Sequence, residues 1–262
     1  MSAKDDRWRL LDTELSAWAH EGRVATLWWR DDDAAASNGA SRRLIALHRQ
    51  FAIPLMLAVV PNAATSALAD ALAGCAQITP IVHGYAHQNH APLGVKKAEF
   101  GAHRPLDVMQ AELGQAMALM RDVFAGCFQP VLVPPWNRIA PELVPHLLGL
   151  GFAGLSAFGA CRNRHPAPGL AQANCHVDLL YGRGKIFPRP QQDVIVDLLQ
   201  HLSARRRGES FEPDEPTGIL THHLAHTPQA WDFLAALWAR LSPQTAPVRW
   251  LNCAEVFNFA AA

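Results

Sequence analysis

The sequence lacks the features that mark several common classes of protein. Its 23 basic and 23 acidic side chains cancel to a formal net charge of zero, so no overall charge draws it to nucleic acid or an anionic membrane. Its five cysteines show no Cys-x-x-Cys spacing, which argues against a zinc ribbon or a disulfide framework. No apolar run reaches transmembrane length, and the amino-terminal stretch lacks the apolar core of a signal peptide. We therefore expect a cytoplasmic protein with neither a nucleic-acid nor a membrane partner.

The 262 residues also contain no internal repeat, low-complexity tract or clear linker, which favours one domain over residues 1–262. Short apolar runs, typical of buried strands, alternate with helical patterns along the whole chain. Strands are expected at 24–29, 54–60, 78–82, 130–133, 154–157, 176–180, 217–221 and 248–251, and helices at 8–20, 40–51, 64–74, 105–125, 141–150, 190–206 and 228–241, with long loops within 160–190. The alternation predicts an α/β fold with parallel strands, and the number of strands favours an irregular barrel.

Polar groups follow four of these expected strands. Because the carboxyl ends of parallel strands meet on one face, groups far apart in the sequence become neighbours there. The groups are Asp31–Asp33, His83 with His87, Pro134–Asn137 and His222.

His83 and His87 are four residues apart, a spacing that places both imidazoles on one side of a helical turn. Two imidazoles and a carboxylate hold one divalent cation and leave a position for water. The donors favour Zn²⁺, with Co²⁺, Ni²⁺, Fe²⁺ and Mn²⁺ as alternatives.

These motifs, in this order, resemble those of the NodB-homology polysaccharide deacetylases, a family of metal-dependent carbohydrate esterases. The matching residues are the aspartate triplet, His83/His87, Val133-Pro134-Pro135-Trp136 and Leu220-Thr221-His222, within residues 24–223. The resemblance implies an irregular (β/α) barrel of about seven parallel strands, the size of that family's fold. It also implies metal-dependent removal of an acetyl or other acyl group from a sugar amide.

The resemblance further implies roles for single residues. Asp32 becomes the catalytic base, Asp33 binds the metal with His83 and His87, and His222 protonates the departing amine. Asp31 and Asp32 as base and ligand form a second register that the triplet allows.

The chain departs from the family at two positions. Val133 stands where the family has an arginine that supports the catalytic aspartate, and the sequence does not choose among Arg30, Arg104 and Arg138 as its replacement. His223 stands where many relatives have aspartate. These departures favour a small N-acetylated carbohydrate-like substrate over a polymer.

Several further residues are candidates for the same face. Pro135, Trp136 and Asn137 are expected to line the substrate site, and Arg104 belongs to a loop that could cover it. His90 is an alternative extra ligand. His226 forms a second His-x3-His with His222, although Thr227-Pro228 is typical of a helix start.

Two other functions stay open at this point. A non-haem iron oxygenase uses the same set of two histidines and one carboxylate. A catalytically inactive carbohydrate-binding protein on the deacetylase fold would explain the missing arginine.

Overall fold

The structure is a computed structural model that describes residues 3–259 except 184, 211, 213, 243 and 245. Its strands are short and mostly buried, as the apolar runs predict. They are β1 (Ala25–Ala34), β2 (Leu55–Val59), β3 (Ile78–His83), β4 (Val131–Val133), β5 (Gly154–Leu155), β6 (Ala171–Gln172), β7 (Cys175–Asp178), β8 (Leu180–Arg183), β9 (Lys185–Pro188), β10 (Thr217–Thr221) and β11 (Val248–Trp250).

The main sheet is parallel throughout and curled. Its strands run in the order β6-β5-β4-β3-β2-β1-β10-β7, and β11 pairs with the start of β1. The Cys175 N–H donates to the Ala157 carbonyl at 3.0 Å, and the Gly159 N–H donates to the Cys175 carbonyl at 2.8 Å. These bonds connect the segment after β5 to β7, so the two ends of the sheet meet in an irregular barrel. β8 and β9 form a separate antiparallel hairpin.

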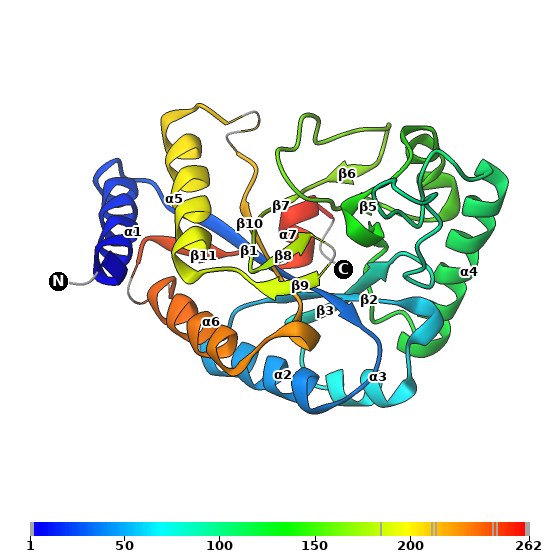
Figure 1. Cartoon of the computed structure of the whole chain (residues 1–262), viewed down its shortest axis with the longest axis horizontal. Coiled ribbons are helices and arrows are strands. Elements are labelled where there is room, and N and C mark those ends of the chain that lie inside the picture. The colour runs from blue at the N-terminus through cyan, green and yellow to red at the C-terminus, as the bar shows by residue number, and fades with distance from the viewer. Residues whose placement is uncertain are drawn as a thin grey trace.

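Helices surround this sheet (Figure 1). The helices are α1 (Ala3–His20), α2 (Gly39–Phe51), α3 (Ser66–Leu72), α4 (Leu106–Phe124), α5 (Gln191–Arg207), α6 (Pro228–Arg240) and α7 (Cys253–Phe257). α1 and α5 pack side by side, while the short α7 lies near the centre of the view. The connections from β1 to β2, β2 to β3, β3 to β4 and β10 to β11 therefore each return through a helix that covers the outside of the sheet.

The two faces of the sheet bury different sets of side chains. Leu27 and Trp29 of β1 belong to the large cluster that includes the apolar faces of the outer helices. Trp28 belongs to a smaller cluster inside the barrel, where Val256 and Phe257 of α7 fill the space. Side chains alternate between the two faces along a regular strand, and this alternation decides on which face each polar residue near a strand end lies.

Most expected elements are present, and the predicted irregular α/β barrel of about seven parallel strands is confirmed. The predicted helix at 141–150 was wrong: the chain forms the 3₁₀ helices Pro141–His146 and Leu148–Leu150. Pro145 lies within the first of them and lacks the N–H that an α-helix requires. The region 160–190, expected as loops beyond its one predicted strand, also contains β6 and the β8–β9 hairpin.

Within the described residues, no helix is long and apolar enough to cross a membrane.

Candidate active site and metal centre

The alternation of β1 separates the three aspartates. Arg30 and Asp32 are two and four residues beyond Trp28, so they extend the barrel-facing row. Asp31 is two residues beyond Trp29 and extends the helix-facing row. All three residues of Arg30–Asp32 are buried. Two adjacent carboxylates thus face different surroundings within one strand.

A bulge then redirects the third aspartate. The register between β1 and β2 shifts between Asp31 and Ala34, and Asp33 takes a left-handed backbone with φ of 72°. Left-handed backbone is uncommon outside glycine, although aspartate tolerates it better than most residues. The strand, expected to end at Trp29, continues to Ala34 through this bulge. The bulge turns the Asp33 carboxylate toward the end of β3.

Asp33, His83 and His87 form a compact set of metal-binding groups. One potential ligand atom from each lies within 4.8 Å of the others. The Asp33 Oδ1 lies 3.1 Å from the His83 Nε2 and 3.2 Å from the His87 Nε2. The His83 Nδ1 donates to the Val133 carbonyl at 3.0 Å, which leaves the Nε2 lone pair for a cation. Among the described residues this is the single group of three with such spacing, and His90 is outside it.

The charges in this set suit a divalent cation. Burial opposes the charge on Asp33, yet the hydrogen bond from His83 and the nearby imidazoles hold the pKa of this carboxyl well below its ordinary value. Burial and the neighbouring His83 lower the pKa of His87, which favours the neutral ring. Burial also opposes a charge on His83, but Asp32 and Asp33 outweigh it and raise the pKa of this ring. An ionised carboxylate beside a neutral imidazole is the state in which both bind metal.

The Asp32 carboxylate forms a buried ion pair with Arg30 and is not hydrogen-bonded to the proposed metal ligands in the described contacts. The Arg30 Nε lies 2.9 Å from the Asp32 Oδ1, and the Nη2 donates to the Oδ2 at 3.0 Å. The guanidinium also donates to Ser156 Oγ at 2.7 Å and to Asn137 Oδ1 at 2.7 Å. Both members of the pair are almost fully buried, at 0% and 2% side-chain exposure. Arg30 therefore supplies the support for an aspartate that Val133 does not give.

We expect Arg30→Met to lower the free energy of unfolding by about 3–5 kcal/mol, because it leaves a buried carboxylate without its partner. Chemical denaturation of both proteins measures the difference. Arg138→Met is the matched control, since the Arg138 guanidinium makes an exposed hydrogen bond to the Lys97 carbonyl. An Arg30→Met protein as stable as the control variant would contradict a structural ion pair at this position.

His222 follows β10 at the same end of the barrel. Its Nδ1 lies 3.8 Å from the Asp178 Oδ1 at the end of β7. Burial raises the pKa of Asp178, with His222 opposing the shift and Asp32 adding to it. The imidazole, with 18% of its side chain exposed, thus belongs to the same electrostatic environment as Asp32. No motif or spacing pairs Asp178 with His222, so only the fold identifies this neighbour.

Asp31 belongs to a different group. Its carboxylate accepts hydrogen bonds from Thr221 Oγ1, from the His223 ring and, at 3.0 Å, from the His223 N–H. Burial opposes the charge on Asp31, but the adjacent His223 keeps the pKa of this carboxyl below its usual value. These bonds tie β1 to the turn that carries His222. In the alternative register the catalytic base would be Asp31, whose carboxylate is already hydrogen-bonded to this turn.

The residues expected at the substrate have mixed surroundings. Trp136 and Asn137 have left-handed backbones, with φ of 57° and 56°. The Trp136 ring centroid lies 4.5 Å from that of His87, while Pro135 is buried. Arg104 instead forms a bidentate pair with Glu112 of α4, with both bonds at 2.7 Å.

A pocket of about 330 Å³ lies beside α5, with His176, His201 and Glu215 in its lining. The His176 ring stacks on His201 at 3.6 Å, and its Nε2 lies 3.2 Å from the Glu215 carboxylate. Burial, followed by the neighbouring His176, lowers the pKa of His201 to about 2.

His226, which forms the second His-x3-His pattern with His222 in the sequence, packs against Trp231, with the ring centroids 4.6 Å apart.

The His201 shift predicts a loss of stability in acid. The unfolded His201 ring binds a proton near pH 6.5, whereas the folded ring does not. The contribution of the neutral folded ring to the free energy of unfolding is therefore fully present above pH 6.5 and falls as the pH decreases. We expect His201→Gln to show a shallower loss of unfolding free energy between about pH 6.5 and 4.5 than wild type. Denaturation curves at several pH values measure this, with exposed His20→Gln as control. Parallel curves for wild type and His201→Gln would contradict the assignment.

The fold and site together define a parallel α/β barrel with an Asp-His-His ligand set at the carboxyl ends of its strands. Neither a protein-family model nor a curated protein sequence matches this chain. Solved structures do match its fold, and at the level of the fold they confirm the resemblance to polysaccharide deacetylases inferred from the sequence motifs.

Three of these structures illustrate the match. A protein from Mycobacterium smegmatis described as a candidate polysaccharide deacetylase has a TM-score of 0.67 and 14% identity, with 90% of each chain covered. A family 4 acetyl xylan esterase from Clostridium thermocellum, in complex with a cobalt ion, has a TM-score of 0.54 and 12% identity, with 89% of this chain and 90% of that chain covered. A family 4 carbohydrate esterase pseudoenzyme from Bacillus anthracis, as a mutant with restored activity, has a TM-score of 0.57 and 14% identity, with 89% and 68% covered. At these identities the likeness shows the fold alone.

Proposed function

We propose that this chain is a metal-dependent hydrolase that removes an acetyl or other acyl group from the amide nitrogen of a small N-acylated, carbohydrate-like substrate. The observation that carries the proposal is one arrangement at the carboxyl end of the barrel. The ligand set Asp33/His83/His87 lies beside a second carboxylate, Asp32, which Arg30 holds and which makes no hydrogen bond to the ligand imidazoles among the described contacts. Such a pair of carboxylates with different tasks is what a metal-assisted hydrolysis requires.

The residues present fit a divalent cation. They offer one ionised carboxylate oxygen and two imidazole Nε2 atoms, with the His83 ring oriented by the Val133 carbonyl. Three protein ligands with a free position are typical of catalytic zinc, and Co²⁺ is a close substitute. A cation bound there would polarise the acyl carbonyl and make a water molecule more acidic.

The remaining chemistry falls to side chains of the chain. Asp32 accepts the proton of the attacking water, and the Arg30 guanidinium 2.9 Å away holds its carboxylate in place. His222 donates a proton to the departing amine, with Asp178 beside its ring. Asp31 takes no part in proton transfer in this proposal, since it is occupied by Thr221 and His223.

The substrate contacts belong to the same proposal. Trp136 packs beside the ligand His87 and offers an aromatic surface to a sugar ring. Pro135 and Asn137 fix the turn that carries this ring, and Asn137 also accepts a hydrogen bond from Arg30. Arg104 pairs with Glu112 and so anchors its loop. Of the four proposed substrate contacts, the one from Arg104 therefore has the least support.

The alternative functions have less support. A jelly-roll scaffold, usual for the two-histidine-one-carboxylate iron oxygenases, consists of antiparallel sheets, whereas the main sheet here is parallel. The argument for an inactive binding protein was the missing arginine at Val133, and Arg30 contacts the aspartate in its place. The presence of a pseudoenzyme among the similar structures keeps this function as an outcome of the test.

The test is acetate release from N-acetylated monosaccharides and short oligosaccharides. The purified chain is stripped of metal with a chelator and then loaded with Zn²⁺ or Co²⁺. We expect acetate only from the loaded protein. A loaded protein that binds these sugars without releasing acetate would favour the inactive binding function. Oxygen consumption with Fe²⁺ and a cosubstrate would favour the oxygenase.

A further inference from the structure

The loop that follows His83 and carries His87 has no regular secondary structure to hold it. It leaves β3 at His83 and passes through two left-handed positions, Gly84 with φ of 62° and His87 with φ of 55°. A histidine in this conformation persists only where its surroundings fix it. The backbone N–H groups of such a loop also need acceptors when they are removed from water. The surroundings of this loop therefore decide where the His87 ring points.

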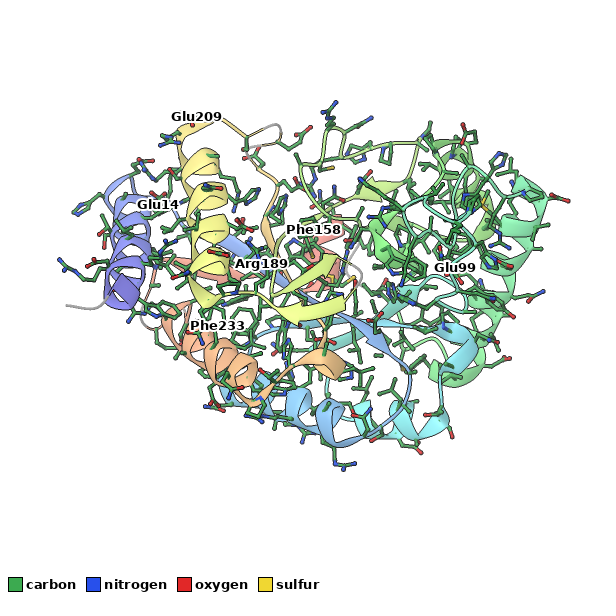
Figure 2. All side chains as sticks on the ribbon, viewed as in Figure 1. Glu14, Glu99, Phe158, Arg189, Glu209 and Phe233 are labelled. Carbon is green, nitrogen blue, oxygen red and sulfur yellow. The ribbon has the colours of Figure 1, made fainter. Side chains whose placement is uncertain are left out.

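One buried carboxylate supplies three of these acceptor contacts. Glu99 has 0% exposure, and Figure 2 shows it inward of α4. Its Oε1 accepts from the Ala86 N–H at 2.8 Å and from the Gln88 N–H at 3.3 Å, and its Oε2 accepts from the Tyr85 N–H at 3.1 Å. The three donors flank His87 on both sides. Hydrogen bonds from N–H groups to an ionised carboxylate are stronger than those between neutral groups.

The glycine of the motif makes this contact feasible. A Cβ added at Gly84 would lie 2.1 Å from the Glu99 Oε2 and 2.6 Å from the Pro135 ring. Any larger residue would push the carboxylate away from the loop, and it would also resist the positive φ. Gly84 and Glu99 thus form one closely fitted unit.

The segment that carries Glu99 is itself anchored. The His90 N–H donates to the Ala98 carbonyl at 3.0 Å, and Arg104 donates to the Glu99 carbonyl at 2.9 Å while pairing with Glu112 of α4. The carboxylate is therefore connected to a long helix through its own backbone.

We infer that Glu99 is a positioning residue for the metal centre, which holds the backbone around His87 so that its imidazole meets Asp33 and His83 at one cation. The inference rests on the proposed function for the identity of the cation site. Among the contacts described, Glu99 makes no hydrogen bond to the ligand rings or to the Asp32 side chain, so it positions the loop through its backbone, and its charge also acts through space on the His87 ring. Groups that orient metal ligands influence affinity without binding the metal.

The test is a Co²⁺ titration of the metal-free full-length chain, followed by visible absorption. We expect Glu99→Gln, which keeps the size but removes the charge, to weaken Co²⁺ binding by about 10- to 100-fold. Glu142→Gln is the matched control, because Glu142 is exposed and none of the hydrogen bonds given for the loop amides involves it. For this exposed residue we expect a change of less than about threefold. Glu99→Gln binding within threefold of wild type, or an equal loss in Glu142→Gln, would overturn the inference.

Two further measurements keep the result interpretable. In a His87→Ala background, Glu99→Gln is expected to cause no additional loss of Co²⁺ affinity, because its target is already absent. In the metal-free protein, the amides of Tyr85, Ala86 and Gln88 are expected to exchange hydrogen faster in Glu99→Gln than in wild type. If Glu99→Gln does not fold, Glu99→Asp, which keeps the charge on a shorter side chain, replaces it with the same expectations.

These measurements separate two failures. A wild-type chain that binds no Co²⁺ would refute the proposed function. Unchanged amide exchange in Glu99→Gln would show that Glu99 does not stabilise the loop backbone. A wild-type chain that binds Co²⁺ as tightly as Glu99→Gln would refute the positioning role alone.

Discussion

Asp32→Asn is expected to reduce acetate release by about 10²–10⁴-fold, the usual contribution of a positioned general base. An asparagine keeps the shape of the side chain and one of the two oxygens that face Arg30, but it cannot accept the proton of the attacking water. Metal binding is expected to persist, since Asp33, His83 and His87 are unchanged. The effect should therefore appear in kcat with the metal content at its wild-type value.

The measurement is acetate release under saturating substrate, together with the metal content of each protein. Exposed Asp70→Asn is the matched control for the change itself. Asp31→Asn tests the other register: it is expected to lower the free energy of unfolding, because it breaks the bonds to Thr221 and His223. Wild-type turnover in Asp32→Asn would show that this carboxylate is not the base.

His87→Ala is expected to abolish activity by removing one of the three protein ligands of the cation. The loss of a direct ligand should weaken Zn²⁺ or Co²⁺ binding by more than the roughly 10- to 100-fold effect typical of groups that only orient a ligand. A chelator should have the same effect on the wild-type protein, and added metal should restore the activity of the wild type alone.

His90→Ala is the matched control for this change. His90 is close to His87 in the sequence, but it is outside the ligand set of the described residues. We expect its metal affinity, measured by the same titration, to stay close to that of wild type. A His90→Ala protein that loses metal while His87→Ala retains it would show that the loop presents a different histidine to the cation.

Much of the fold could be predicted because its signals are local. Apolar runs such as Pro54–Val60 are long enough for a buried strand and too short for a helix, and they alternate with helical patterns. The failures were also local. In the segment 141–150, Pro145 outweighed a periodicity that otherwise favoured a helix. The very short strand β6 has no pattern of its own and is defined only by its partner β5.

Part of the candidate site could likewise be predicted from the sequence and part could not. Each of the groups at Asp31–Asp33, His83/His87 and His222 follows a strand, so the topology of a parallel sheet brings them together from the sequence alone. The period of two along β1 was also available in the sequence, and it would have placed Asp32 on the face of Trp28. The left-handed turn at Asp33 could not be predicted from the sequence, because a bulge depends on how β1 pairs with β2.

The sequence by itself determined the order of the strands and helices, the end of the barrel that collects the polar residues, and the types of ligand gathered there. Only the tertiary structure decided which partner each charged group has. Arg30 with Asp32, Asp178 with His222 and Glu99 with the His87 loop are pairs in which burial makes an uncompensated charge costly. Such a charge takes the donor or counter-charge that packing places beside it, and that neighbour is fixed by the assembled barrel and not by distance along the chain.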